Sequence, residues 1–271
     1  MAKINLAADN QTDECAWSNL RKQAAAQAVK EPALSSLFYA TILEQESLGG
    51  ALINHLSSKL ATEDFTPLKL RRVLSDALEL NPMIVECAAK DLLAVKDRDP
   101  AARSHLQAFL YFKGYMAIQT HRFAHALYKS GREMIAFHLQ NRSSEQFGVD
   151  INPAARIGHG IMLDHATGFV MGETATVGND CSILQGVTLG GTGKADEDRH
   201  PKIGNGVLIG ANATVLGNII VGNNAKIAAG SVVLKPVPSQ CTVAGVPAKP
   251  VAGPCCGEPA KSMDQTLGDE A

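Results

Sequence analysis

A six-residue repeat of apolar positions runs through the second half of the chain, between Ile151 and Val237. A glycine directly follows seven of its thirteen apolar positions. An α-helix would need recurrences near 3.6 residues, and an ordinary amphipathic strand would alternate at every second residue. The repeat instead predicts a β-solenoid with one hexad per flat face and three faces per coil, stacked at roughly 4.8 Å. The apolar positions are 151, 157, 163, 171, 177, 183, 189, 203, 209, 215, 221, 227 and 233.

The repeat is interrupted twice. Two extra residues are expected after Gly168, and eight more, Ala195 to Lys202 (ADEDRHPK), follow the hexad LGGTGK. A long loop that leaves a regular solenoid is often functional. We therefore expect functional residues near the second interruption.

The first half of the chain predicts helices between residue 12 and about residue 145, rich in Ala, Leu, Glu, Lys and Gln. Breaks are expected at Pro and Gly residues, and Asp99-Pro100 is typical of a helix N-cap followed by a first helical residue. The expected organisation is α+β: a helical region over 1–147, a solenoid over 148–252, and a flexible tail over 253–271. The expected breaks are Pro32, Gly49-Gly50, Pro67, Pro82, Pro100, Gly114 and Gly131.

Composition narrows the function classes. The net charge of −2 gives no basis for binding nucleic acid or an anionic membrane surface. No apolar run approaches about 18 residues, and the N-terminus lacks a secretory signal, so we expect neither a membrane span nor export. The six cysteines show no CxxC spacing and predict reduced thiols in a cytoplasmic protein. A metal site at Cys255 and Cys256 is a less favoured alternative to a solvated pair.

Several strings together point to one family: VDINPAARIG, GIMLDHATG, SILQGVTLGGTGK, DRHPKIG, GSVVLKPVP and AGVPAK. Over roughly residues 15 to 252 the chain resembles the bacterial serine O-acetyltransferases, members of the hexapeptide-repeat acyltransferases. LDHATG combined with GGTGK and DRHPKIG is far more specific than isolated hexads. The resemblance implies that the solenoid is a left-handed parallel β-helix, a hand that no residue spacing establishes.

His165 and its neighbours are the candidate catalytic residues. His165 lies two places after Leu163, at an outward position, and a near-neutral imidazole suits a general base. From spacing alone, a surface imidazole is the alternative. Asp164 stands where glycine is usual, so it either caps a turn or holds a substrate ammonium. The resemblance implies that Asp150 orients the imidazole, although a turn residue at the boundary is the other interpretation.

The remaining substrate residues come from the resemblance. It implies that Asp99 binds the amino group of the substrate and that Arg199 and His200, in the inserted loop, bind its carboxylate. Without it, Asp99 is a helix N-cap and the ADEDRH run a solvated charge cluster. GGTGK fails the phosphate-loop pattern because Thr188 and Ala195 replace required residues.

The resemblance further implies acetyl transfer from acetyl-CoA to the hydroxyl of L-serine, as the first step of cysteine biosynthesis. No permanently bound cofactor and no metal are expected; acetyl-CoA is a co-substrate, and L-cysteine is the expected inhibitor. Backbone NH groups near Gly191 and Thr192 are expected to stabilise the oxyanion. The expected acetyl-CoA contacts are Gly191, Thr192, Gly210, Ala211, Lys226, Ala229 and Lys249.

Assembly follows from the same resemblance. We expect a homotrimer with sites between chains, or a dimer of trimers joined by the helical regions. The family's C-terminal tail ends in isoleucine and binds O-acetylserine sulfhydrylase, whereas this chain ends at Ala271. Alanine buries much less surface than isoleucine, which argues against that complex here.

Two other functions remain as alternatives. One is a hexapeptide acyltransferase for another small hydroxyl or amine acceptor, against which Asp99, Asp164 and Arg199 argue. The other is a zinc enzyme of the γ-carbonic anhydrase type, with His159, His165 and His200 as ligands. His159 and His165 are one hexad apart and should lie on different faces of one chain.

Overall fold

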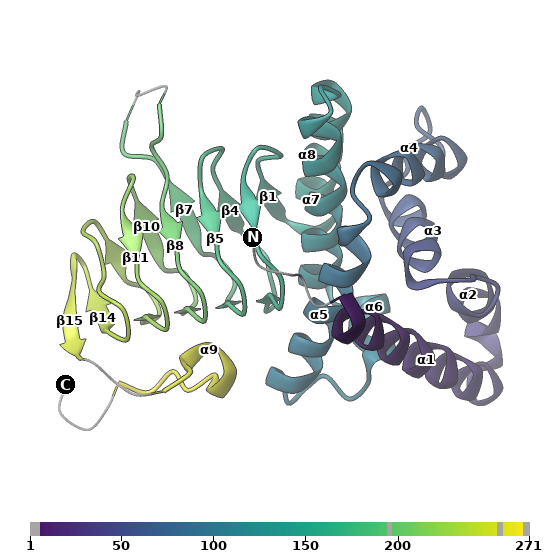
Figure 1. The fold of residues 1–271 in the computed structure, drawn as a ribbon, viewed down its shortest axis with the longest axis horizontal. Helices are drawn as coiled ribbons and strands as arrows, with labels where there is room; N and C mark the ends of the chain where they lie inside the picture. Colours follow the sequence, from purple (N-terminus) through teal and green to yellow (C-terminus); the bar gives the residue numbers. More distant parts are fainter. Residues whose placement is uncertain (1–5, 194–196, 254–256, 268–271) are drawn as a thin grey trace.

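The computed structural model describes residues 6–193, 197–253 and 257–267, in which a group of helices abuts one end of a solenoid (Figure 1). This arrangement confirms the predicted fold class. The helices are α1 (Leu6–Lys30), η1 (Pro32–Leu34), α2 (Ser35–Phe38), η2 (Tyr39–Leu43), α3 (Leu48–Leu60), α4 (Pro67–Leu80), α5 (Met83–Arg98), α6 (His105–Tyr111), α7 (Lys113–Lys129), α8 (Glu133–Phe147) and α9 (Pro259–Ser262).

The solenoid strands form three sheets that the chain visits in turn, and we call them sheets A, B and C. Sheet A contains β1 (Val149–Ile151), β4 (Phe169–Met171), β7 (Thr188–Gly190), β10 (Thr214–Leu216) and β13 (Val232–Val233). Sheet B contains β2 (Arg156–Ile157), β5 (Thr176–Val177), β8 (Lys202–Ile203) and β11 (Ile220–Val221). Sheet C contains β3 (Met162–Leu163), β6 (Ser182–Ile183), β9 (Leu208–Ile209), β12 (Lys226–Ile227), β14 (Thr242–Gly245) and β15 (Ala248–Ala252). The three corners between sheets are the A/B, B/C and C/A edges.

The strand register confirms the repeat. Eighteen residues separate Ile209 from its parallel partner Ile227, as three hexads require. The separation is twenty where Leu163 pairs with Ile183 and twenty-six where Ile183 pairs with Ile209. The excesses of two and eight residues equal the two predicted insertions. The apolar positions of the repeat line the interior, where most are less than 5% exposed.

The smaller insertion lies a few residues earlier than predicted. The carbonyl of Thr167 accepts a backbone amide from the next coil, as the carbonyl of Gln185 does one coil further on. Thr167 therefore occupies the ordinary corner position, and the two extra residues are His165 and Ala166 rather than residues after Gly168. The prediction of the position was wrong because a spacing between apolar residues counts an insertion without locating it inside the hexad.

Two predicted features of the helical region are also corrected. Asp99 does not start a helix: it follows the end of α5, and its Oδ1 accepts a bond from the amide of Ala101 at 2.7 Å. The next helix starts at His105 and is capped by Ser104, whose hydroxyl accepts from the amide of Gln107 at 3.0 Å. The Gly49-Gly50 pair lies in the first turn of α3 instead of in a break.

A buried ion pair fixes the helices to the first coil. Asp91 is 1% exposed and accepts from Arg122 Nη2 at 2.7 Å and from the amide of Ile161 at 2.8 Å. Arg122 also donates to the carbonyl of Gly158 at 2.6 Å. A buried pair is strongly destabilising to break when one partner is removed, because the other charge stays unpaired. These contacts hold α5 and α7 against the coil that carries β3.

The C-terminal segment folds back along sheet C, where Figure 1 places α9 beside the solenoid. Ser182 Oγ donates to the carbonyl of Ala260 at 2.7 Å, and Lys226 Nζ donates to the carbonyl of Thr266 at 2.5 Å. Residues 257–267, part of the tail expected to be flexible, thus contact the solenoid, and the flexibility itself stays a prediction. Ser182 and Lys226, on the outward face of sheet C, are buried where this segment covers them.

Two further expectations concern cysteines and membranes. Cys15, Cys87, Cys181 and Cys241 are free thiols, whereas the Cys255-Cys256 pair lies outside the described residues. None of the described helices is long and apolar enough to cross a membrane.

Candidate active site

A cavity of about 400 Å³ lies where the end of α5 and the start of α7 meet the C/A edge. We call it the Asp164 cavity. Three of the residues predicted to act on the substrate, Asp99, Asp164 and His165, line it together. The structure thus brings together groups that lie 65 and 66 residues apart along the chain. A concave site with a few convergent polar groups is the usual form of a small-molecule site.

His165 reaches the cavity from the two-residue insertion. Its φ of 54° and the φ of 61° at Ala166 both lie in the left-handed region, which non-glycine residues seldom occupy. Ala166 is fully buried and anchors the bulge, whereas the side chain of His165 is 75% exposed. The imidazole therefore points away from the apolar interior, as predicted. Its Nε2 lies 3.7 Å from Asp164 Oδ2, too far for a hydrogen bond.

Gly114 allows α7 to approach the corner that carries these residues. A Cβ at Gly114 would lie 1.9 Å from the carbonyl oxygen of Leu163, the residue before Asp164. Only glycine permits this approach without a backbone shift. The sequence indicated Gly114 as a helix break, but it is the second residue of α7 and sets the distance between that helix and the corner.

The electrostatics of the cavity centre on Asp164. Burial raises the pKa of the Asp164 carboxyl, and Asp99 raises it further, while His165 acts in the opposite direction. Two carboxyl groups that share one cavity oppose each other's ionisation. A cation placed between Asp99 and Asp164 would relieve that opposition, so the pair suits a ligand with an ammonium group.

Lys113 was not singled out from the sequence, yet it lines the same cavity. Its ammonium donates to the hydroxyl of Thr167 across the opening between α7 and the C/A edge. A lysine that precedes a helical glycine gives no sequence signal for a site. Only the packing of α7 on the corner places it there.

Asp150 lies on β1 in sheet A, and its Oδ1 accepts from Gln140 Nε2 at 2.6 Å. Asp150 pairs in register with Val170, the second residue of β4 after the His165 corner. Among the hydrogen bonds of the described residues, none joins Asp150 to His165. The predicted orienting contact therefore remains a prediction.

Arg199 and His200 lie at the A/B edge, on the far side of sheet A from His165. Arg199 Nη2 lies 2.8 Å from Glu173 Oε2. The ring of His200 is 7% exposed; its Nδ1 lies 2.8 Å from Thr174 Oγ1, and its Nε2 would lie 2.0 Å from a Cβ on Gly172. Burial, and then Arg199, lower the pKa of His200. Within one chain these two residues do not reach the Asp164 cavity.

The glycine-rich loop lies with Arg199 and not with His165. A Cβ on Gly191 would lie 3.5 Å from the Arg199 carbonyl oxygen, and one on Gly217 would lie 3.1 Å from Thr192 Cγ2. The predicted oxyanion donors therefore share the A/B edge with the predicted carboxylate ligands.

The other predicted acetyl-CoA contacts divide differently. Gly210 and Ala211 follow β9, and Ala229 follows β12, at the C/A edge. They lie on the same edge as His165, two and three coils further along the solenoid. A Cβ on Gly210 would lie 2.5 Å from the amide nitrogen of Ala229, so these corners are tightly stacked. Lys226 is 8% exposed and engaged by the C-terminal segment, and Lys249 is exposed on β15.

The three histidines considered as metal ligands lie on three different edges. His159 follows β2 at the B/C edge, His165 follows β3 at the C/A edge, and His200 precedes β8 at the A/B edge. They do not converge within one chain. Among the described residues, no three histidine, cysteine or acidic side chains gather in a metal-binding group.

Two family models match the chain. The model described as "Serine acetyltransferase, N-terminal" matches residues 16–120, and "Bacterial transferase hexapeptide (six repeats)" matches residues 200–235. A serine acetyltransferase of Haemophilus influenzae is 52% identical over 249 residues, covering 92% of this chain and 93% of that protein.

Solved structures agree over nearly the whole fold. A serine acetyltransferase in complex with cysteine has a TM-score of 0.93 and 51% identity, covering 94% of this chain and 99% of that chain. The Neisseria gonorrhoeae enzyme in complex with serine has a TM-score of 0.85 and 56% identity, covering 87% and 96%. The Brucella abortus enzyme in complex with coenzyme A has a TM-score of 0.87 and 52% identity, covering 89% and 96%.

Proposed function

This chain belongs to the serine acetyltransferase family, and from that premise we propose a mechanism in which His165 transfers the proton of the serine hydroxyl. The enzyme is an acyltransferase that moves the acetyl group of acetyl-CoA to L-serine, giving O-acetyl-L-serine and CoA. The observation that carries the mechanism is the exposed imidazole of His165 at the mouth of a cavity that also contains Asp99 and Asp164.

The chemistry needs one base and no covalent enzyme intermediate. His165 accepts the hydroxyl proton as the serine oxygen attacks the thioester carbonyl. The tetrahedral intermediate then expels the CoA sulfur, and the imidazolium returns the proton to it, so that the enzyme ends unchanged. Holding both substrates together supplies much of the rate increase, because the attack becomes effectively intramolecular.

Serine is held, in this proposal, by its ammonium and its carboxylate. Asp99 and Asp164 bind the ammonium, which explains why two carboxyl groups share a cavity despite their mutual effect on the pKa of Asp164. Arg199 binds the carboxylate, and His200 is buried where it supports that loop. Asp150 orients His165 and stabilises its charged form once the substrates order the corner.

The position of Arg199 requires a second chain. Because the A/B and C/A edges border opposite sides of sheet A, a single solenoid cannot present Arg199 and His165 to one serine molecule. We propose a trimer in which the A/B edge of one chain faces the C/A edge of its neighbour. The helical regions then join two trimers into a hexamer, for which light scattering would show six chains per particle.

Acetyl-CoA lies, on this arrangement, in the groove between two chains. Gly210, Ala211 and Ala229 form one wall above His165, and Gly191 and Thr192 of the facing chain form the other. Glycine and alanine leave room for the pantetheine arm, and backbone NH groups near Gly191 can meet the developing oxyanion. Lys226 and Lys249 serve the phosphates, and Lys226 does so only when the Thr266 carbonyl releases it.

L-Cysteine inhibits by occupying the serine position. It carries the same ammonium and carboxylate as serine, so the same residues would hold it, and a related enzyme has been solved with cysteine bound. Competition with serine is the expected kinetic pattern. We place the enzyme in the cytoplasm, where free thiols stay reduced. Ala271 lies outside the described residues, so the expectation that it disfavours a complex with O-acetylserine sulfhydrylase stays a prediction.

A thiol-release assay with acetyl-CoA tests the substrate assignment. Serine should give the highest kcat/KM, above threonine, homoserine and a hexosamine, because only serine matches both the charge pair and the hydroxyl position. A hexosamine as the best acceptor would support the alternative of another hexapeptide acyltransferase and reject the amino-acid roles of Asp99 and Arg199.

A further inference from the structure

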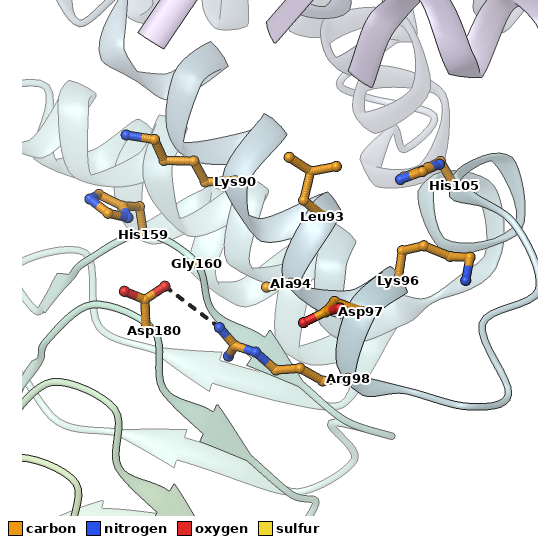
Figure 2. Close-up of a pocket in the computed structure, with 10 residues that line it drawn as sticks. All are labelled: Lys90, Leu93, Ala94, Lys96, Asp97, Arg98, His105, His159, Gly160 and Asp180. Atoms are coloured by element: carbon orange, nitrogen blue, oxygen red, sulfur yellow. Dashed lines mark ion pairs between the residues drawn. The ribbon is translucent and has the colours of Figure 1, made fainter. Parts of the chain in front are cut away.

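A second cavity, of about 650 Å³, lies between α5 and the B/C edge, away from the residues assigned to acetyl transfer. Its volume falls within the roughly 300–1,000 Å³ typical of small-molecule sites. Figure 2 shows Lys90 and Arg98 of α5 directed towards His159 and Asp180 on the solenoid corners, whereas Lys96 extends the other way, on the side of His105. We call it the Arg98 cavity. No step of the proposed mechanism uses it.

Arg98 is a buried cation whose ion pair is long and partly exposed to solvent. It is 7% exposed, and burial lowers its pKa, which means that its charged form is held in an unfavourable environment. Its Nη2 reaches Asp180 at 3.5 Å, but the side chain of Asp180 is 50% exposed. A buried cation is costly unless it is closely paired. An anion bound next to Arg98 would therefore be stabilised by the buried guanidinium.

Buried nitrogens without a hydrogen-bond partner also favour a polar ligand in this cavity. Arg98 Nη1 donates to the Cys181 carbonyl at 3.3 Å and to Ser182 Oγ at 3.1 Å, whereas the buried Nε has no partner. Both ring nitrogens of His105, which also lines the cavity, are buried without a partner. Buried polar atoms in native proteins nearly always have a protein or water partner, so these nitrogens are candidates for a hydrogen bond to a ligand.

The cationic groups stand at two ends of the cavity. Figure 2 shows Lys96 near His105 at one end, and Arg98 with His159 and Lys90 towards the other. The proximity of Lys96 to His105 is also felt electrostatically, because Lys96 adds to the effect of burial in lowering the pKa of His105. The acidic residues of the lining are Asp97 and Asp180. A ligand with a carboxylate at each end would therefore meet a cationic side chain and an unpartnered nitrogen at both ends of the cavity.

We propose that the Arg98 cavity binds a small dicarboxylate, with one carboxylate on Lys96 and His105 and the other on Arg98 and His159. Arg98 offers its guanidinium and Lys96 its ammonium, and the imidazoles donate hydrogen bonds. Charge-assisted bonds of this kind are the strong ones in proteins. Arg98 at this cavity is followed directly in the chain by Asp99 at the Asp164 cavity.

Calorimetric titration of the full-length protein with succinate tests the proposal. Saturating serine is present to fill the Asp164 cavity, and ionic strength is held constant with sodium chloride. We expect one succinate per chain, and binding on the order of tenfold weaker for butyrate, which has the same length and a single carboxylate. Equal affinity for succinate and butyrate, or no saturable binding of succinate, would overturn the proposal.

Variants assign the binding to this cavity. Lys96→Ala combined with His159→Ala should weaken succinate binding by about tenfold or more, because it removes one partner at each end. Lys30→Ala, an exposed lysine at the end of α1, is the matched control and should bind as wild type. Both variants keep Arg98, whose loss would disturb the junction with the solenoid. Unchanged binding in the double variant would place succinate elsewhere and reject the site.

This test is independent of acetyl transfer. It measures binding without turnover, so an inactive protein that still bound succinate would contradict only the proposed function. A protein that acetylated serine but ignored succinate would contradict only the Arg98 cavity.

Discussion

His165 gains its position from a local irregularity. It and Ala166 are two consecutive non-glycine residues with positive φ, and each such residue costs of order 1–3 kcal/mol. The fully buried methyl group of Ala166 and the bonds that Thr167 and Gly168 make to neighbouring coils hold the bulge. Strain of this kind is usual at catalytic positions, where the surrounding structure fixes a group in an otherwise unfavourable place.

Replacing His165 tests its role as the base. His165→Ala should lower kcat by about 10²–10⁴. The fold should not change, because the side chain is 75% exposed and packs against little. Steady-state kinetics with circular dichroism as the check on folding would measure this. Wild-type turnover in a folded variant would reject the assignment, and Lys59→Ala, an exposed residue of α3, serves as the control.

At the scale of elements, the site depends on how α5 and α7 meet the first coil. The end of α5 supplies Asp99, and the start of α7 supplies Lys113, while Gly114 lets the helix touch the Leu163 carbonyl. The helical region therefore lines the candidate site. We expect its packing to be pH-sensitive, because it encloses histidines, His55 and His121, whose pKa values are lowered by burial.

His55 links α3 to α6 and should make stability depend on pH. It is 4% exposed, stacks on Phe109 at 5.5 Å between ring centroids, and lies with Nε2 3.2 Å from the Leu110 carbonyl oxygen. Burial, and secondarily Lys59, lower the pKa of His55 from 6.5 to about 4. The folded state thus binds fewer protons than the unfolded state between these values, and stability falls as pH falls from about 6.5 to about 4.

The size of this effect can be measured by urea unfolding at several pH values. Lowering the pKa of His55 from 6.5 to about 4 corresponds to at most roughly 3.4 kcal/mol of pH-dependent stability. His55→Gln keeps a donor for the Leu110 carbonyl but does not titrate, so its free energy of unfolding should vary less with pH. A slope equal to that of wild type would show that His55 is not responsible.

At the scale of the whole molecule, the residues predicted to form the site divide into two groups. The C/A edge holds Asp164 and His165, the A/B edge holds Arg199 with the glycine-rich loop, and sheet A separates the two edges. A closed ring of three chains brings unlike edges together at every interface. Each chain would then contribute one half to each of two sites.

Mixing two inactive variants tests this division. His165→Ala and Arg199→Ala should each lose most activity, but co-assembled at equal amounts they should recover about a quarter of wild-type activity. At random mixing, that is the share of interfaces that join two intact halves. Differently tagged chains, purified for both tags, would supply the mixed particles for kinetic assay.

The matched control combines two changes on the same edge. His165→Ala mixed with Asp164→Ala should not recover activity, because every interface keeps one altered residue in the same half. Recovery in this control, or none in the first mixture, would contradict a site shared between chains.

Much of the fold was predictable from the sequence because its main interactions are repetitive. Each hexad places an apolar side chain above the one from the previous coil, so the repeat determines sheets, register and interior. The helical region, the lengths of the two insertions and the outward direction of His165 also followed from patterns, whereas the position of the smaller insertion did not. The hand of the coils came only from the resemblance.

What the sequence did not determine depends on contacts between distant segments. The bulge at His165 and Ala166, the turn at Asp99, the approach of Gly114 to Leu163 and the docking of residues 257–267 on sheet C all arise from packing. A repeat fixes how neighbouring coils stack because that free energy is local and recurs. The two cavities, one containing Asp99 and His165 and the other Arg98 and His159, form where the helices pack against the solenoid. That packing occurs only once in the molecule, so a periodic pattern in the sequence cannot predict it.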